Sequence, residues 1–158
     1  MKRNLLFLSA FFFLFINGGC MKDNDGCKMK TVQSEEGTIT SYATTNGITA
    51  TAHSSGLYYQ VTSPGSGATP TLSSKVFVKY TGKLLNGTVF DSQTNATLTG
   101  FTVSGLIQGW QIGLGLIKKG GTIKLIVPSS LAYGCQGSGS TIPGNSVLYF
   151  EIELVDVQ

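Results

Sequence analysis

The sequence predicts an α+β domain in which about five or six antiparallel strands form a sheet and one central helix lies across it. Short stretches with apolar residues at every second position recur along the chain, separated by turn residues. Only 12% of the residues are charged and glycine is abundant, which is typical of β-rich folds with many turns. Residues 105–121 instead space their apolar side chains as a helix does. One helix on an antiparallel sheet is an α+β architecture.

The first residues have the pattern of a bacterial lipoprotein leader. A positive start is followed by the apolar run 5–16, which is too short to span a membrane. Small residues and then Cys20 resemble a lipobox, so we interpret residues 1–19 as a lipoprotein signal peptide and Cys20 as the site of lipid attachment. The alternative is an ordinary signal peptide cut near Gly19, with Cys20 a free thiol.

Residues 20–33 are polar and predict a flexible tether. A lysine and acids directly after Cys20 resemble the export signal of some surface lipoproteins of Gram-negative bacteria. We therefore expect a protein of the bacterial cell envelope. Its lipid would anchor it to the outer membrane, on the periplasmic or the surface-exposed side.

Charge and residue counts exclude several classes of protein. Nine lysines and eight acids remain after the leader, and no arginine does, so the basic stripe of a nucleic-acid binder is absent. His53 is the only histidine, which argues against a zinc enzyme and against a serine or cysteine triad. With Cys20 set aside, Cys27 and Cys135 remain in an oxidising compartment, and a disulfide between them is a hypothesis. The alternative is two unrelated thiols.

Residues 34–56 predict a short N-terminal helical extension on the main domain. Ser34 can cap a helix that runs to about Thr45, because two acids follow it and Asn46-Gly47 can end the helix. A strand from Ile48 to Ala52 completes the extension.

The main domain, residues 57–158, contains the sheet. Apolar residues alternate well over residues 75–84, and Asn86-Gly87 is a tight-turn signal that leads into the next strand. Pro128 closes a later strand, and Leu131 to Pro143 is a long glycine-rich loop. The predicted strands are Leu57–Thr62, Lys75–Leu84, Thr88–Asp91, Phe101–Val103, Thr122–Val127 and Val147–Val157.

The central helix belongs to the stretch 105–121, which holds the only tryptophan, Trp110. Glycines within this stretch disfavour a helix, so a helix that accepts them is expected to pack closely against the sheet. Gly120-Gly121 would end the helix, with Lys118 and Lys119 in its last turn. Trp110 would point into the space between helix and sheet, and the alternative is that it is an ordinary core residue.

Seven short segments in the main domain then occur in a specific order. They are Val78-Lys79-Tyr80-Thr81-Gly82, Asn86-Gly87-Thr88-Val89-Phe90-Asp91-Ser92, Leu106-Ile107-Gln108-Gly109-Trp110, Lys119-Gly120-Gly121, Ile126-Val127-Pro128, Leu131-Ala132-Tyr133-Gly134 and Ile142-Pro143. Together they resemble the FKBP-type peptidyl-prolyl cis/trans isomerase family over about residues 57–157. The resemblance implies a twisted antiparallel sheet wrapped around a short helix, with a hydrophobic pocket between them.

The resemblance also implies roles for individual residues. Trp110 would form the pocket floor, the Ile107 N–H and the Tyr133 hydroxyl would hold substrate carbonyls, and Asp91 would lie at the rim near the prolyl amide. On pattern alone, Asp91 could instead cap a turn and Tyr133 could be a core residue. The remaining substrate-binding positions would be Tyr80, Phe90, Leu106, Ile142 and Phe150.

The resemblance implies a peptidyl-prolyl isomerase that assists the folding of exported proteins. It would need neither cofactor nor metal, would act on proline-containing polypeptides, and is expected to be a monomer. The rim departs from the family pattern: Gly105 stands where glutamine or glutamate is common, and Ser138 stands where some members have histidine. These departures leave an alternative function, a noncatalytic module on the cell envelope that binds proline segments or acts as a chaperone.

Overall fold

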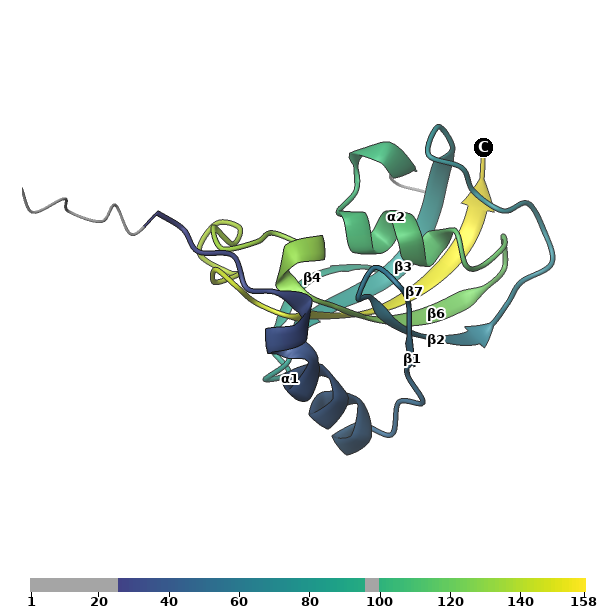
Figure 1. Cartoon of the computed structure of the whole chain (residues 1–158). Helices are drawn as coiled ribbons and strands as arrows, with labels where there is room; N and C mark the ends of the chain where they lie inside the picture. Colours follow the sequence, from purple (N-terminus) through teal and green to yellow (C-terminus); the bar gives the residue numbers. More distant parts are fainter. Residues whose placement is uncertain (1–25, 96–99) are drawn as a thin grey trace, which may run out of the picture.

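A computed structural model describes residues 26–95 and 100–158 of the chain. The predicted leader and the lipid site at Cys20 lie outside the described residues. Within them, seven antiparallel strands form one sheet with a helix on each face (Figure 1). The strands are β1 (Thr51–Ala52), β2 (Tyr58–Ser63), β3 (Lys75–Leu84), β4 (Val89–Gln93), β5 (Phe101–Thr102), β6 (Thr122–Val127) and β7 (Leu148–Val157).

The strand order is β1-β2-β6-β7-β3-β4, and β5 also pairs with β3. The predicted α+β class is confirmed. All six strands predicted for the main domain form, and the sheet has a seventh because β1, two residues of the N-terminal extension, also pairs with it. The helices are α1 (Val32–Thr45) and α2 (Gln108–Leu114), and the 3₁₀ turns are η1 (Val103–Gly105) and η2 (Ser129–Leu131).

The alternation of side chains along the central strands creates two hydrophobic clusters. Leu125 on β6 and Phe150 on β7 belong to the main core, which also contains Trp110 of α2. Their neighbours Ile126 and Tyr149 belong to a second cluster, which includes residues of α1. Because successive side chains on a strand point to opposite faces, the two helices cover opposite faces of the sheet.

Helix α2 lies close to β6 because two of its glycines face the sheet. A Cβ atom on Gly113 would lie 2.7 Å from the Cδ atoms of Leu125, and one on Gly109 would overlap Val127. The predicted close packing of this glycine-rich stretch is therefore confirmed, and side chains at these two positions would hold the helix away from the strand.

The helix in the stretch 105–121 is nevertheless shorter than predicted, because α2 ends at Leu114. Beyond it, the N–H groups of Lys118 and Lys119 donate to carbonyl oxygens in the loop 64–68. The prediction that these lysines occupy the last helical turn, with a glycine pair ending the helix, is wrong. A loop distant in sequence supplies acceptors that the helix would otherwise provide.

Helix α1 begins earlier than predicted. Thr31 is its N-cap, and the Thr31 hydroxyl oxygen accepts the N–H of Ser34 at 3.2 Å. The prediction that Ser34 is the cap is wrong, because a second capping residue stands three positions before it. The predicted strand from Ile48 also shrinks to β1, since the Ile48 N–H donates to the Ala43 carbonyl at the end of α1.

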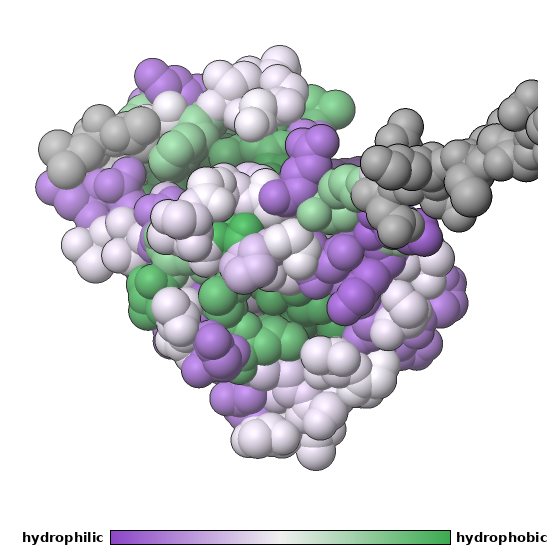
Figure 2. Space-filling view, turned by 90° about the vertical axis from the view of Figure 1, so that its left-hand side faces the viewer, coloured by the Kyte–Doolittle hydropathy of each residue, from purple (hydrophilic) through white to green (hydrophobic). Residues whose placement is uncertain are grey.

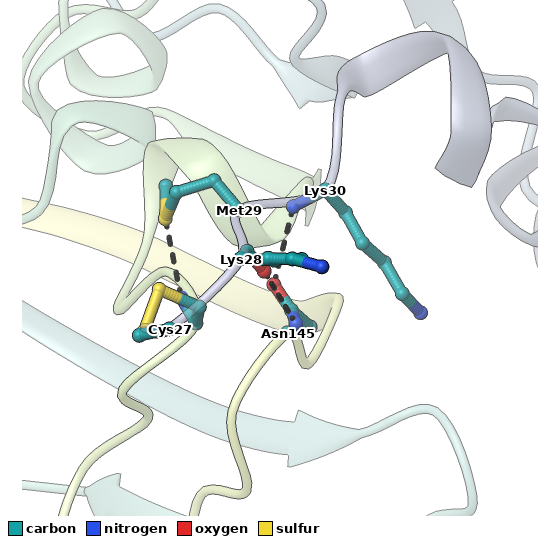
Figure 3. Close-up of a disulfide and its surroundings, with 6 residues drawn as sticks. Cys27, Lys28, Met29, Lys30 and Asn145 are labelled. Atoms are coloured by element: carbon teal, nitrogen blue, oxygen red, sulfur yellow. Dashed lines mark hydrogen bonds between the residues drawn. A yellow bond between two sulfur atoms is a disulfide. The ribbon is translucent and has the colours of Figure 1, made fainter. Parts of the chain in front are cut away.

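The segment before α1 is attached to the long loop between β6 and β7 (Figure 3). The structure contains a disulfide between Cys27 and Cys135, whose Cα atoms lie 5.3 Å apart. Asn145 of the same loop donates to the Lys28 carbonyl at 3.1 Å and accepts the Lys30 N–H at 3.2 Å. The segment before α1 is therefore fixed to the surface of the main domain.

No helix within residues 26–95 and 100–158 has the length and apolar character to cross a membrane.

Candidate functional site

A cavity of about 250 Å³ opens between α2 and the sheet. Most of its lining is aromatic or aliphatic, and the one charged group in it is a carboxylate. A space-filling view shows apolar surface recessed among polar residues on the face that lies to the left in Figure 1 (Figure 2). The cavity is lined by Tyr80, Phe90, Asp91, Phe101, Gly105, Leu106, Ile107, Trp110, Tyr133 and Phe150.

A second hollow, of about 360 Å³, lies over β3, β6 and β7. Its lining includes Lys79 and Glu153, which form an exposed ion pair at 3.2 Å. It is more open to solvent and carries more charge than the cavity beside α2. The cavity beside α2 is therefore the better candidate for holding an apolar ligand group.

Trp110 forms the floor of the cavity from the first turn of α2. Its indole ring meets the rings of Tyr80 and Phe150 edge to face, at centroid distances of 5.0 Å and 5.3 Å. Such contacts hold an aromatic ring in one orientation. Trp110 is only 4% exposed, yet it lines the cavity, so it belongs both to the main core and to the cavity lining.

Tyr80 and Asp91 meet at the cavity rim because β3 and β4 pair there. The Tyr80 hydroxyl donates a hydrogen bond of 2.6 Å to Asp91 Oδ2. Burial, and then this hydrogen bond, raise the pKa of Tyr80 above its ordinary value. The Tyr80 phenol is therefore neutral at physiological pH and holds the exposed carboxylate in place.

Tyr133 approaches the same carboxylate from the loop between β6 and β7. Burial, and then the charge of Asp91, raise the pKa of Tyr133, so its hydroxyl keeps its proton. The side chain is 40% exposed. Among the described residues its hydroxyl has no hydrogen-bond partner, which leaves it able to donate to a ligand in the cavity.

Gly82 on β3 makes room for two of the wall residues. A Cβ atom at this position would lie 2.7 Å from the Phe90 ring and 2.8 Å from the Phe150 ring. The two rings stack edge to face with centroids 5.6 Å apart. The wall of the cavity thus depends on a strand residue without a side chain.

The turn that precedes α2 is held by the helix itself. The Ile107 carbonyl accepts the N–H groups of Trp110 at 2.9 Å and Gln111 at 3.2 Å. The Gln111 side chain donates to the carbonyls of Leu106 at 2.7 Å and Ser104 at 3.3 Å. Leu106 and Ile107 therefore stand at a defined position at the cavity edge.

The structure brings eight of the nine predicted pocket residues together and leaves one out. Ile142 does not line the cavity: it lies within the main core, and its backbone pairs with that of Ser138. Two lining residues, Phe101 and Gly105, were missed. The Phe101 ring lies 6.3 Å from that of Tyr80. The sequence did contain a signal for Phe101, because it is an aromatic residue on the predicted strand that leads directly into the helical stretch 105–121.

Comparison with known sequences points to one family. The sequence model of the FKBP-type peptidyl-prolyl cis-trans isomerases matches residues 67–155. The FKBP-type isomerase FkpA of Escherichia coli K12 is 48% identical over 106 residues, which is 66% of this chain and 39% of FkpA. A probable FKBP-type isomerase of Haemophilus influenzae is 46% identical over 104 residues, 65% of this chain and 43% of the relative. The match thus spans about two fifths of each curated relative.

Solved structures agree with the sequence comparison. The crystal structure of E. coli FkpA has a TM-score of 0.70 and 39% identity, over 80% of this chain and 61% of that chain. A peptidyl-prolyl isomerase from Pseudomonas syringae pv. tomato has a TM-score of 0.68 and 27% identity, over 83% of this chain and 98% of that chain.

Proposed function

The chain belongs to the family of FKBP-type peptidyl-prolyl cis-trans isomerases, and from this premise we propose that it isomerises the peptide bond before proline in exported proteins. One observation carries the proposal: an aromatic cavity floored by Trp110, with the hydroxyl of Tyr133, which has no hydrogen-bond partner among the described residues, beside the carboxylate Asp91. Polypeptides that contain proline would be the substrates, and their isomerisation would assist folding in the envelope.

The reaction needs no covalent step. The X-Pro amide must lose resonance as it twists, over a barrier of about 18–20 kcal/mol, and unaided this takes tens to hundreds of seconds. The twisted amide is less dipolar than the planar one, so a water-poor aromatic cavity favours the twisted state over the planar one. Catalysis then requires only that the cavity binds the proline ring and fixes one side of the bond.

The lining residues supply these two requirements. We assign Trp110 to the floor beneath the proline ring, and the backbone N–H of Ile107 and the hydroxyl of Tyr133 to the carbonyls on either side of it. Asp91, oriented by Tyr80, would lie beside the prolyl amide nitrogen, which becomes more basic as the bond twists. The wall would be formed by Tyr80, Phe90, Phe101, Leu106 and Phe150.

An assay of a short X-Pro peptide by NMR exchange spectroscopy tests the function. The purified protein is expected to accelerate exchange between the cis and trans forms. Trp110→Ala should lose most of this acceleration at equal concentration of folded protein, because the floor is gone. Binding of the peptide without acceleration would contradict the isomerase and favour a noncatalytic proline-binding or chaperone module.

We further propose that residues 1–19 are a lipoprotein signal peptide and that Cys20 carries the lipid. The domain would then be a monomer tethered to the outer membrane of a bacterial envelope, periplasmic or surface-exposed. The apolar run 5–16 and the small residues before Cys20 support this proposal. Labelled palmitate should enter the protein in cells and should not enter Cys20→Ala, and equal labelling of both would contradict it.

A further inference from the structure

Glu35 of α1 is a buried carboxylate that reaches across the molecule. It is only 2% exposed, and its Oε2 accepts the N–H of Ser129 at 2.9 Å, although 94 residues separate the two in sequence. α1 lies on the opposite face of the sheet from α2 (Figure 1). Burying a carboxylate is costly unless hydrogen bonds compensate it. The bond to Oε2 comes from the loop that carries Tyr133, whereas Oε1 is buried and has no hydrogen-bond partner among the described residues.

The N–H that Glu35 accepts is the first donor at the start of that loop. β6 ends at Val127, and Pro128, which has no N–H, stands at the N-cap position of η2 without a side-chain capping bond. Ser129 follows and is only 1% exposed, so water has little access to its N–H. The carboxylate of Glu35 thus takes the place that a capping side chain would fill.

The carbonyl of the same residue holds both neighbours of Tyr133. Ser129 O accepts the N–H of Ala132 at 3.1 Å and the N–H of Gly134 at 2.8 Å. Glu35 therefore fixes Ser129 through its N–H, and Ser129 fixes through its carbonyl the residues before and after Tyr133.

We propose that Glu35 is a positioning residue for the Tyr133 hydroxyl, an inference that rests on the proposed isomerase function. Glu35 lies outside the segment 67–155 that matches the family, so the N-terminal extension would complete the active site from the far face of the sheet. Because a misplaced catalytic group costs rate, loss of the Glu35 acceptor is expected to lower kcat/KM roughly three- to tenfold, mainly through kcat.

Three variants on one helix test the proposal with the X-Pro peptide assay. Glu35→Leu removes the acceptor and should show the full loss, whereas Glu35→Gln keeps a side-chain oxygen and should retain most activity. Ile39→Ala is the matched control, because Ile39 is fully buried on α1 and packs in the second cluster, which contains neither Ser129 nor Tyr133. Ile39→Ala should lower stability but keep kcat/KM per folded molecule.

A double-mutant cycle separates positioning from general destabilisation. In a Tyr133→Phe background, Glu35→Leu should cause no further loss of kcat/KM, because the group it positions is already absent. If Glu35→Leu fails to fold, Glu35→Asp replaces it. The aspartate side chain is one methylene shorter, so it keeps a carboxylate but moves the acceptor oxygen away from the Ser129 N–H. The proposal would be overturned if Glu35→Leu, or Glu35→Asp in its place, kept the wild-type kcat/KM. It would also be overturned if the loss were equal in the wild-type and the Tyr133→Phe proteins.

Amide hydrogen exchange gives a readout that needs no activity. Glu35→Leu should speed exchange at Ala132 and Gly134, and Ile39→Ala should not. If the wild-type protein showed no isomerase activity while these amides responded, the proposed function would fail and the positioning contact would stand. Unchanged exchange at both amides would overturn the positioning role even in an active enzyme.

Discussion

At the scale of single residues, the rim of the cavity is a small electrostatic arrangement of two phenols and one carboxylate. Asp91 accepts the hydroxyl of Tyr80 and lies close enough to Tyr133 for its charge to raise the pKa of that phenol. One phenol is thereby used in orienting the acid, and the other keeps a proton that it can donate. The difference between the two tyrosines lies in their partners and not in their chemistry.

Tyr133→Phe should lower kcat/KM about five- to tenfold, the effect of one lost hydrogen bond to a substrate carbonyl, and change stability by less than about 0.5 kcal/mol. Peptide exchange rates and urea unfolding would measure the two effects. Tyr149→Phe is the control, because its hydroxyl donates to Glu151 on the α1 face of the sheet. Equal losses of turnover in both variants would contradict the role of Tyr133.

The pKa of Tyr80 also predicts how stability depends on pH. Burial and the bond to Asp91 raise this pKa in the folded protein, whereas an unfolded tyrosine titrates near about pH 10. As the pH rises, the unfolded chain therefore loses its proton first. The contribution of the protonated Tyr80 phenol to the free energy of unfolding is therefore fully present below about pH 10 and is lost above it.

Urea unfolding at a series of alkaline pH values would measure this loss. The free energy of unfolding should decline less steeply in Tyr80→Phe than in the wild-type protein, because the variant has one fewer buried phenol to titrate. Tyr149→Phe should also reduce the decline, since burial and Glu151 raise the pKa of Tyr149. Identical slopes in all three proteins would exclude these phenols as the cause.

At the scale of elements, α2 owes its position to where its glycines fall. Gly109 and Gly113 face β6, and the helix backbone approaches the strand because no Cβ atoms intervene. This approach sets the depth at which Trp110 lies and so the shape of the cavity floor. A short helix of seven residues gains little stability by itself, so its packing decides that it forms.

Gly113→Ala should destabilise the protein by about 1–3 kcal/mol, because the new methyl group overlaps Leu125 by more than helix propensity repays. Gly115→Ala is the matched control. Gly115 has a φ of −67°, and a Cβ there meets only ordinary contacts, so the change should be neutral or stabilising by up to about 1 kcal/mol. Urea unfolding of both variants checks this, and equal effects would contradict it.

At the scale of the whole molecule, the chain before β2 is bound to the domain at several points distant in sequence. α1 buries Ile39 and Ala43 against the sheet, and the segment before it is joined to the β6–β7 loop. The disulfide from Cys27 to Cys135 encloses most of the domain in one covalent loop. Such a crosslink restricts the unfolded chain more than the folded one.

Removing this crosslink should cost about 4–5 kcal/mol, the chain-entropy value for a sequence separation of 108 residues. Urea unfolding of the double variant Cys27→Ser, Cys135→Ser would measure it. A reductant should destabilise the wild-type protein by a similar amount and leave the double variant unchanged. An unfolding midpoint insensitive to reductant in the wild-type protein would contradict the prediction.

Local patterns predicted the strands well because their signals are local. Alternation over residues 75–84 and 122–127 coincides with β3 and β6, and Asn86-Gly87 lies in the turn before β4. Element ends were less predictable where a partner far along the chain intervenes. α2 ends at Leu114, and the N–H groups of Lys118 and Lys119, predicted to lie in its last turn, instead donate to the loop 64–68.

The sequence by itself determined the fold class, the family and most of the aromatic lining, because periodicity and ordered motifs are written in consecutive residues. Only the tertiary structure decided that Phe101 joins the cavity, that Ile142 leaves it, and that Glu35 reaches Ser129 from the far face. Contacts of this kind depend on which side chains the folded sheet brings together, so the spacing of residues along the chain does not predict them.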